Sequence, residues 1–442
     1  MPAPMSTDFA ASFARLECSQ ELQWLQAIRQ AAMERFSELG FPNFRQEEWK
    51  YTKVDFTRKK TFEAAPASSN GLTADRLAQL TFGNLDCPRL VFVNGHYSQE
   101  LSSLQEVSSQ IQVQSLSEVL KENPERVKPH LTQYAGYQDH AFVALNTAFI
   151  EDGAFVHIPE GKPIHQPIHL LFLSTAPGET TISHPRNLII LDDNSQATIL
   201  ESYVGLSPRA YFTNSVTEIA VGENANLDHY KLQRESEEAF HIATLQIHQG
   251  RSSKVRAFDV TLGGVLTRNE VNGVLDGEGA ECALDGLYLV SGGQHVDNHT
   301  RLEHAKPHCD SREAYKGVLD GQATGVFHGR IVVQPEAQRT DSKQTNDNLL
   351  LSDDAVINTK PQLEIYADDV KCTHGATIGQ LDEEALFYLR SRGIGTAMAR
   401  SLLIYAFATQ VTDGIRVETV RAAINDHLFS WLPQGQLIKE AV

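Results

Sequence analysis

The chain changes its pattern of hydrophobic and polar positions several times, and the first part is helical. Residues 8–40 carry apolar side chains at steps of three and four, which predicts amphipathic helix ending at Gly40. Residues 64–75 are small and polar and predict a linker. Residues 115–135 read as helix again, with breaks at two prolines. We therefore expect a mainly helical region over residues 1–135.

From about residue 140 the pattern becomes β-rich, with short apolar runs separated by Gly, Asn, Asp and Ser. Turn-then-strand starts align with steps of 28, 28, 27 and 43 residues, at Ala197, Ala225, Ser253, Ala280 and Ala323. A step near 28 fits a coil of two long strands that stacks on the next coil, so we expect a β-solenoid core over residues 136–380. A β-sandwich with similar strand lengths is the alternative. Helical segments at both ends would cap the coils.

The last part of the chain, residues 381–442, is helical. Leu381–Gly393 has acidic residues in its first turn and basic residues in its last, which favours a helix, and two further helices cover Ala397–Thr409 and Val417–Leu428. These segments carry more apolar surface than a domain of this size needs for its own core. We expect part of that surface to dock a partner.

Composition narrows the class of protein. The 442 residues are 41% hydrophobic and carry a formal net charge of −18, which argues against nucleic acid as the main partner. The N-terminus lacks a basic segment followed by an apolar one, and the longest apolar run, near Leu402–Ala408, is far short of a membrane span. We expect a cytoplasmic protein that binds neither nucleic acid nor membrane.

Cysteines are few and widely spaced, and none forms a CxxC pair; they are Cys18, Cys87, Cys282, Cys309 and Cys372. This spacing argues against a disulfide framework and against a zinc site of four thiolates, and free thiols favour a reducing compartment. The sequence also lacks a Walker A loop, a GxSxG motif and an HExxH motif. An ordinary hydrolase or P-loop ATPase is therefore not expected.

A cluster of histidines admits two interpretations, a metal site or histidines without a metal role. Within fifteen residues the chain places His295, His299, His304, His308 and Cys309. With Glu303 they could form the site of a metal-dependent enzyme. The flanking Gly and Pro residues favour strand and loop instead, and in that case these side chains are exposed or partnered histidines on a solenoid face.

A second candidate lies in the stretch Tyr366–Gly379, which predicts a strand. Cys372 and His374 are two residues apart, so on a strand they share one face. A thiolate and a neutral imidazole can ligate zinc or iron, including the iron of an iron–sulfur cluster. Two ligands do not close a site, so others would come from elsewhere. The alternative is a small core residue beside a capping polar group.

The same stretch carries a resemblance to a known family. The chain resembles the SufB/SufD family of iron–sulfur cluster assembly proteins, its SufD branch in particular, and the similarity covers most of the sequence. The residues that carry it are Gln338–Ser352, Lys360–Gly379 and Leu381–Ile394, supported by Glu48–Thr52, Tyr315–Leu319 and Phe327–Ile331. SufB is longer and has further cysteines with a CxxC-type pattern, which this chain lacks.

The resemblance implies a fold and a set of partners. It implies a right-handed parallel β-helix with two long strands per turn and helical ends, in a complex with SufB and two copies of the ABC-type ATPase SufC. The C-terminal helices match the region through which the family binds SufC. The end of the β-helix around Cys372 and His374 matches the region that pairs with SufB.

The resemblance also implies a role for the two candidate ligands. His374 corresponds to a ligand or essential polar group at the subunit interface, and Cys372 to an assisting residue, where a transient iron–sulfur cluster forms together with a cysteine of SufB. The expected function is that of a scaffold subunit without catalysis of its own, which helps iron entry and can form a homodimer when isolated. The family complex is linked to reduced flavin, for which the sequence has no fingerprint. A metal-dependent enzyme and a plain β-solenoid interaction protein remain the alternatives.

Overall fold

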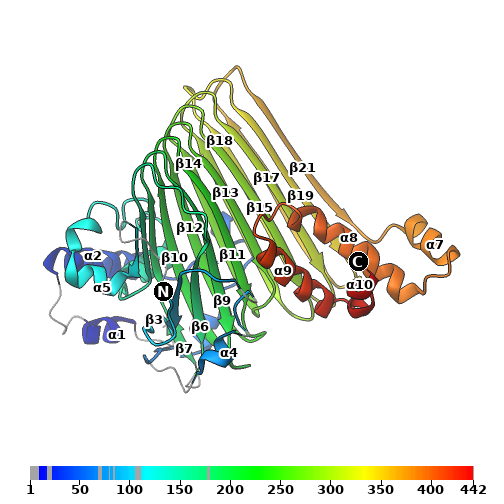
Figure 1. The fold of residues 1–442 in the computed structure, drawn as a ribbon, viewed down its shortest axis with the longest axis horizontal. Helices are drawn as coiled ribbons and strands as arrows, with labels where there is room; N and C mark the ends of the chain where they lie inside the picture. The colour runs from blue at the N-terminus through cyan, green and yellow to red at the C-terminus, as the bar shows by residue number, and fades with distance from the viewer. Residues whose placement is uncertain are drawn as a thin grey trace.

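The protein, seen in a computed structural model, is built around a parallel β-helix (Figure 1). The structure describes residues 9–16, 22–67, 72–78, 80–82, 85–104, 111–176 and 180–441. Within these ranges the strands form a first sheet of 11 strands and a second sheet of 10 strands, and successive long strands alternate between the two. Each coil thus gives one strand to each sheet. The expected mainly β fold with a parallel β-helix is confirmed, and its handedness stays an expectation.

The strand bounds follow this alternation. In the first sheet they are β1 Glu63–Ala64, β4 Gln112–Ser115, β5 Ala154–Ile158, β7 Thr181–Ser183, β8 Arg186–Leu191, β10 Tyr211–Val221, β12 Phe240–Gln249, β14 Leu266–Leu275, β16 His295–His304, β18 Thr324–Val333 and β20 Val356–Ile365. In the second sheet they are β2 Arg89–Val93, β3 His96–Tyr97, β6 Ile168–Ser174, β9 Gln196–Gly205, β11 Asn226–Arg234, β13 Lys254–Thr261, β15 Glu281–Val290, β17 Asp310–Leu319, β19 Asp341–Leu350 and β21 Lys371–Gly379.

The interior between the two sheets is largely apolar. Parallel strands in register place equivalent side chains above one another, so rings stack along the axis of the coil. Phe172 lies between Phe92 and Tyr203, with ring centroids 4.9 and 4.8 Å away. Burial of such rings is a main source of stability for a fold in which each coil contacts only its neighbours.

The turn that leads into each strand of the second sheet repeats a short pattern. A residue with left-handed backbone, φ between 52° and 73°, stands at Asn194, Asn224, Ser252, Gly279, His308 and Arg339. A small or medium-sized buried residue follows each one, at Ser195, Ala225, Ser253, Ala280, Cys309 and Thr340. Glycine, Asn and His tolerate the left-handed region better than most residues, which explains part of this composition.

This turn pattern corrects the predicted repeat. The steps from Ala225 to Ser253 and from Ser253 to Ala280 are coils, but the last step of 43 residues ran from the second sheet to Ala323, which precedes β18 of the first sheet. The coil that begins at Cys309 was therefore missed. The first start was also misplaced, because Leu227 pairs with Ala197, which makes Ser195 the equivalent of Ala225. A buried Cys fills the small position that Ala or Ser fills in other coils.

Helices of the N-terminal region pack on the outer surface of the first sheet and beside the first coils. Their bounds are α1 Phe9–Leu16, α2 Gln23–Leu39, η1 Glu47–Trp49, α3 Phe56–Lys59, α4 Ala74–Ala78, α5 Leu116–Glu122, η2 Pro124–Arg126 and α6 Ala141–Ala148. The predicted helix over residues 8–40 is thus α1 and α2, with Gly40 at the end of α2. The predicted helix over 115–135 is shorter, ending at Glu122 before a turn of η2. Residues 68–71 of the predicted linker, and Cys18, lie outside the described residues.

The C-terminal helices are α7 Glu383–Ser391, α8 Thr396–Thr412, α9 Glu418–Trp431 and α10 Gly435–Ala441. Helices α8 and α9 lie along the outer face of the second sheet, whereas α7 stands away from it (Figure 1). Ile404 and Leu428 pack there with Leu289 and Val318. The expectation that these helices cap the last coil was wrong, because their apolar faces find the sheet surface instead. No helix in the described part of the chain is long and apolar enough to cross a membrane. The domain boundaries at residues 135 and 380 stay a prediction.

Candidate functional site at the open end of the β-helix

The β-helix ends at β20 in the first sheet and β21 in the second. Within the described residues each of these strands has a neighbour on one side only, β18 for the former and β19 for the latter. Nearly every residue of β21 is exposed, whereas at least half of the residues in β17 and in β19 are buried. The predicted strand Tyr366–Gly379 begins only at Lys371, because the first five residues form the turn from β20. The last coil therefore has no cover.

Cys372 and His374 lie on the row of β21 that faces the interior between the two sheets. Cys372 pairs in register with Ser342, and His374 pairs with Gln344. Ser342 and Gln344 are buried, 0% and 1% exposed, because β21 covers them. The equivalent row on β21 has nothing over it, so His374 is exposed and Cys372 is half-buried. The shared face predicted from the sequence is present, and it faces the interior of the β-helix at the uncovered end.

The surroundings of Cys372 keep its thiol protonated. Burial raises the pKa of Cys372 above its ordinary value, and the charge of Asp341 raises it further. A thiol of this kind becomes a good ligand only when a cation displaces its proton. Within the described residues the structure brings no third His, Cys, Asp or Glu into ligand distance of this pair.

Apolar residues surround the pair at the same end. Val356, Ile365, Tyr366 and Ile378 are each exposed, by 39–60%, which is unusual for large apolar side chains at the end of a sheet. The two terminal strands also present unpaired backbone N–H and C=O groups. Such edges pair readily with another chain, so this end has the properties of a subunit interface.

The imidazole cluster at residues 295–309 does not form one site. His295 and His299 lie on the outer face of β16, whereas His304 points inward, where its Nε2 is 2.8 Å from Ser311 Oγ. His308 occupies the left-handed turn position, and buried Cys309 donates from Sγ to the carbonyl of Gly277 at 3.2 Å. These residues are separated by the strand alternation and by the turn. The interpretation of partnered histidines on a solenoid face accounts for them.

The structure brings together one group that sequence reasoning missed. Glu48, His299 and His328 place ligand atoms within 4.8 Å of one another, the only such group of three found in the described ranges. His299 and His328 are register partners on adjacent strands, 29 residues apart, which is one coil. That interval was the available signal, but only a correct alignment of coils reveals it. Glu48 comes from η1, far away in sequence.

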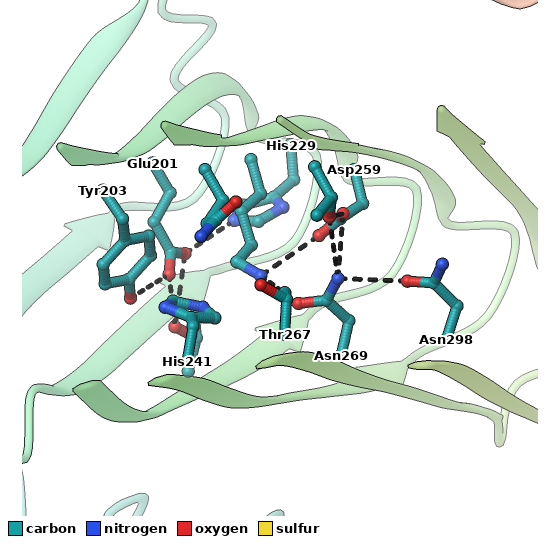
Figure 2. A network of polar contacts seen from close by, with 12 residues as sticks. Glu201, Tyr203, His229, His241, Asp259, Thr267, Asn269 and Asn298 are labelled. Atoms are coloured by element: carbon teal, nitrogen blue, oxygen red, sulfur yellow. Dashed lines mark hydrogen bonds and ion pairs between the residues drawn. The ribbon is translucent and has the colours of Figure 1, made fainter. Parts of the chain in front are cut away.

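A buried polar network lies between the sheets, several coils from the open end (Figure 2). Glu201 accepts hydrogen bonds from Tyr203 at 2.6 Å and from His229 at 2.9 Å. Burial opposes its charge, but the bonds from His229 and Tyr203 hold the pKa of Glu201 below its ordinary value.

A second part of this network is centred on a lysine. Lys231 Nζ lies 3.2 Å from Asp259 and donates to Asn269 Oδ1 at 2.6 Å, and Asn269 donates to Asn298 at 3.0 Å (Figure 2). Each buried charge has an opposite charge or several hydrogen bonds, as burial requires. The network fixes neighbouring coils to one another and is closed to solvent.

Comparison with known proteins gives one family over most of the chain. Residues 172–407 match the family described as SUF system FeS cluster assembly, SufBD core domain, and residues 7–170 match the SufBD protein N-terminal region. An iron–sulfur cluster assembly SufBD family protein of Synechocystis is 37% identical over 90% of this chain and 88% of its own length. The iron–sulfur cluster assembly protein SufD of Escherichia coli is 32% identical over 92% of this chain and 93% of its own length.

A more distant relative is plastidic. Protein ABCI7, chloroplastic, of Arabidopsis thaliana is 29% identical over 91% of this chain and 85% of its own length. The two family matches together span the helical N-terminal region, the β-helix and the start of the C-terminal helices. The chain therefore belongs to the SufBD family of iron–sulfur cluster assembly proteins.

Proposed function

We propose that this SufD homologue acts in iron–sulfur cluster assembly as a scaffold subunit, without a catalytic step of its own. It would pair with a SufB subunit end to end, through the last coil of the β-helix. The observation that carries the proposal is the open end itself. An inward row that is buried in every neighbouring coil is exposed on β21, and it carries Cys372 and His374.

The incomplete ligand set supports a shared site. A thiol and an imidazole are suitable for iron, but iron in a cluster takes more ligands than these two residues supply. Because the open end presents unpaired strand edges, a partner β-helix docked there would add its side chains opposite Cys372 and His374. Iron or a nascent cluster, the cargo of the assembly, would form between the subunits.

The C-terminal helices are the proposed contact for the SufC ATPase. On α7 the aromatic side chains Phe387 and Tyr388 are 71% and 57% exposed, whereas α8 and α9 bury their apolar faces on the second sheet. In the absence of SufB, a second copy of the chain could occupy the same open end and give a homodimer. We place this assembly in the cytoplasm. We assign no residue of this chain to the binding of reduced flavin.

The decisive experiment separates cluster chemistry from assembly. His374→Ala and Cys372→Ser are compared with Thr373→Ala, which alters the neighbouring exposed residue on the opposite face of β21. Each variant is purified with SufB and SufC and supplied anaerobically with iron, sulfide donor and ATP, and the cluster is followed by its visible absorption. We expect cluster formation to be lost with His374→Ala, weakened with Cys372→Ser and unchanged with Thr373→Ala. Full cluster formation by an assembled complex that carries both site substitutions would refute the shared site.

A further inference from the structure

Three side chains from distant parts of the sequence converge on the outer face of the first sheet. Glu48 lies on η1, His299 on β16 and His328 on β18. His299 and His328 are directly paired in the sheet, with ring centroids 4.8 Å apart. The side chains of His299 and His328 are 11% and 7% exposed, whereas that of Glu48 is 52% exposed. The group is therefore held by the sheet on two sides and open to solvent on the third.

The two imidazoles turn the same nitrogen toward the carboxylate. His299 Nδ1 is 3.2 Å and His328 Nδ1 is 3.5 Å from Glu48 Oε2. Bonds of about 2.0–2.2 Å from zinc to nitrogen and oxygen would put neighbouring tetrahedral ligand atoms about 3.4 Å apart. The two distances to Glu48 thus match this spacing, and the ligand atoms of all three residues lie within 4.8 Å of one another.

Both far nitrogens have partners of the kind that orient metal-binding histidines. His328 Nε2 is 2.6 Å from Gln362 Oε1, and His299 Nε2 is 3.0 Å from buried Asp297 Oδ1. A proton on each Nε2 leaves a lone pair on each Nδ1, directed at the same point. Asp297 Oδ1 has no other hydrogen-bond partner among the described residues, so a proton on His299 Nε2 would satisfy it.

Arg268 makes a second arrangement possible. Its Nη1 is 3.1 Å from His299 Nε2 and 2.9 Å from the carbonyl oxygen of Glu48, to which it donates. If His299 Nε2 accepts from Arg268, the proton lies on Nδ1 and is donated to Glu48. That is the metal-free form, a plain hydrogen-bond network. Binding of a cation would release or move this proton.

The charge around the group favours an added cation. Lys360 is paired with Glu47, and Arg330 is paired with Glu364, so these four charges cancel. Among the described cations, Arg268 contacts the group directly, and it lies between Asp297 and Glu270. With neutral histidines and the carboxylate of Glu48, the immediate surroundings keep about two negative charges, which a divalent cation would neutralise.

We propose that Glu48, His299 and His328 form a binding site for a divalent first-row transition metal ion, of the class that takes imidazole and carboxylate ligands. The ion would fasten the N-terminal segment Glu47–Trp49 to β16 and β18 of the β-helix. This is a structural site on the side of the coil, separate from the open end that carries Cys372 and His374. It does not depend on SufB, SufC or cluster formation.

Cobalt(II) titration of the full chain tests the site, because the visible bands of bound Co²⁺ report its coordination number and geometry, and the ligand variants identify the residues. The background for every sample is the double variant Cys372→Ser/His374→Ala, which removes the other candidate ligands. We expect one Co²⁺ per chain, displaced by Zn²⁺. Glu48→Gln and His328→Gln should weaken binding at least about 100-fold, since a ligand matters more than its outer partners.

The matched control is His248→Asn on β12, which removes a partly exposed histidine that lies 3.4 Å from a single carboxylate, Asp276. It should bind Co²⁺ as the background does.

Thermal unfolding gives a second readout: Zn²⁺ should raise the midpoint of the background and of His248→Asn, and leave that of Glu48→Gln unchanged. Glu48 is half exposed, so this variant should fold. Absence of stoichiometric binding, or binding that persists in Glu48→Gln, would show that the three residues are a hydrogen-bond network only.

Discussion

Gln344 Nε2 donates a hydrogen bond to Glu313 Oε2 at 2.7 Å inside the β-helix, one strand from the open end. Glu313 is fully enclosed, and apart from Gln344 its bonded partner is the hydroxyl of Thr300, at 2.9 Å. Its other carboxylate oxygen has no hydrogen-bond partner among the described residues. Burial therefore outweighs these two bonds and raises the pKa of Glu313 to about 7.

This shift predicts how stability depends on pH. The folded protein holds the Glu313 proton up to about pH 7, whereas the unfolded chain loses it near pH 4.5. The folded state binds more protons between these values, so the free energy of unfolding falls as pH rises from about 4.5 to 7 and then levels off. The loss from this one group is at most about 3 kcal/mol.

Urea unfolding at several pH values checks the effect. Glu313→Gln should lack this part of the pH dependence and be more stable than the wild type at pH 8 relative to pH 5. Glu336→Gln, which changes an exposed residue of the turn between β18 and β19, should follow the wild-type curve. Parallel curves for Glu313→Gln and the wild type would mean that Glu313 is ionised inside the fold.

A second prediction concerns close packing between coils. Gly286 pairs in register with Tyr315, and a Cβ placed on Gly286 would lie 2.2 Å from the ring of Tyr315. The ring is buried and packs against Phe327, with centroids 5.1 Å apart, so it has little room to move. Gly286→Ala should lower the free energy of unfolding by about 1–3 kcal/mol, the usual effect of overpacking a core.

Gly293 supplies the control for this packing argument. It is an exposed turn residue with ordinary backbone, and a Cβ there meets no atom within 4 Å. Gly293→Ala should change stability by less than about 0.5 kcal/mol. Equal midpoints of chemical unfolding for the two alanine variants would contradict the close approach of Tyr315 to Gly286.

The sequence predicted the β-helix and the shared strand face of Cys372 and His374, but it did not predict how the coils align with one another. The period near 28 appeared because a left-handed turn and a small buried residue recur in each coil, as at Asn224 and Ala225. The coil at His308 and Cys309 was hidden because these residues resemble metal ligands more than they resemble Asn-Ala. Without that coil, His299 and His328 could not be aligned as strand neighbours.

The placement of the C-terminal helices was also beyond sequence reasoning. Their apolar faces indicated burial, but the same residues could have covered the end of the coil or the face of the second sheet. The outer face of that sheet is itself apolar at Leu289 and Val318, so the helices pack on this face and not on the end of the coil. Burying these side chains against Ile404 and Leu428 leaves the last coil uncovered.

The last prediction concerns the contact that we propose between α7 and the SufC ATPase. Phe387 and Tyr388 on α7 are exposed aromatic neighbours, and aromatic residues of this kind commonly dominate the energy of an interface. The double variant Phe387→Ala/Tyr388→Ala should bind purified SufC at least about 30-fold more weakly, which corresponds to about 2 kcal/mol. Its far-ultraviolet circular dichroism should be unchanged, because neither side chain belongs to the core.

Phe44→Ala is the matched control, since Phe44 is 63% exposed but lies in the N-terminal region. Undiminished SufC binding by the double variant, or an equal loss with Phe44→Ala, would place the ATPase contact elsewhere.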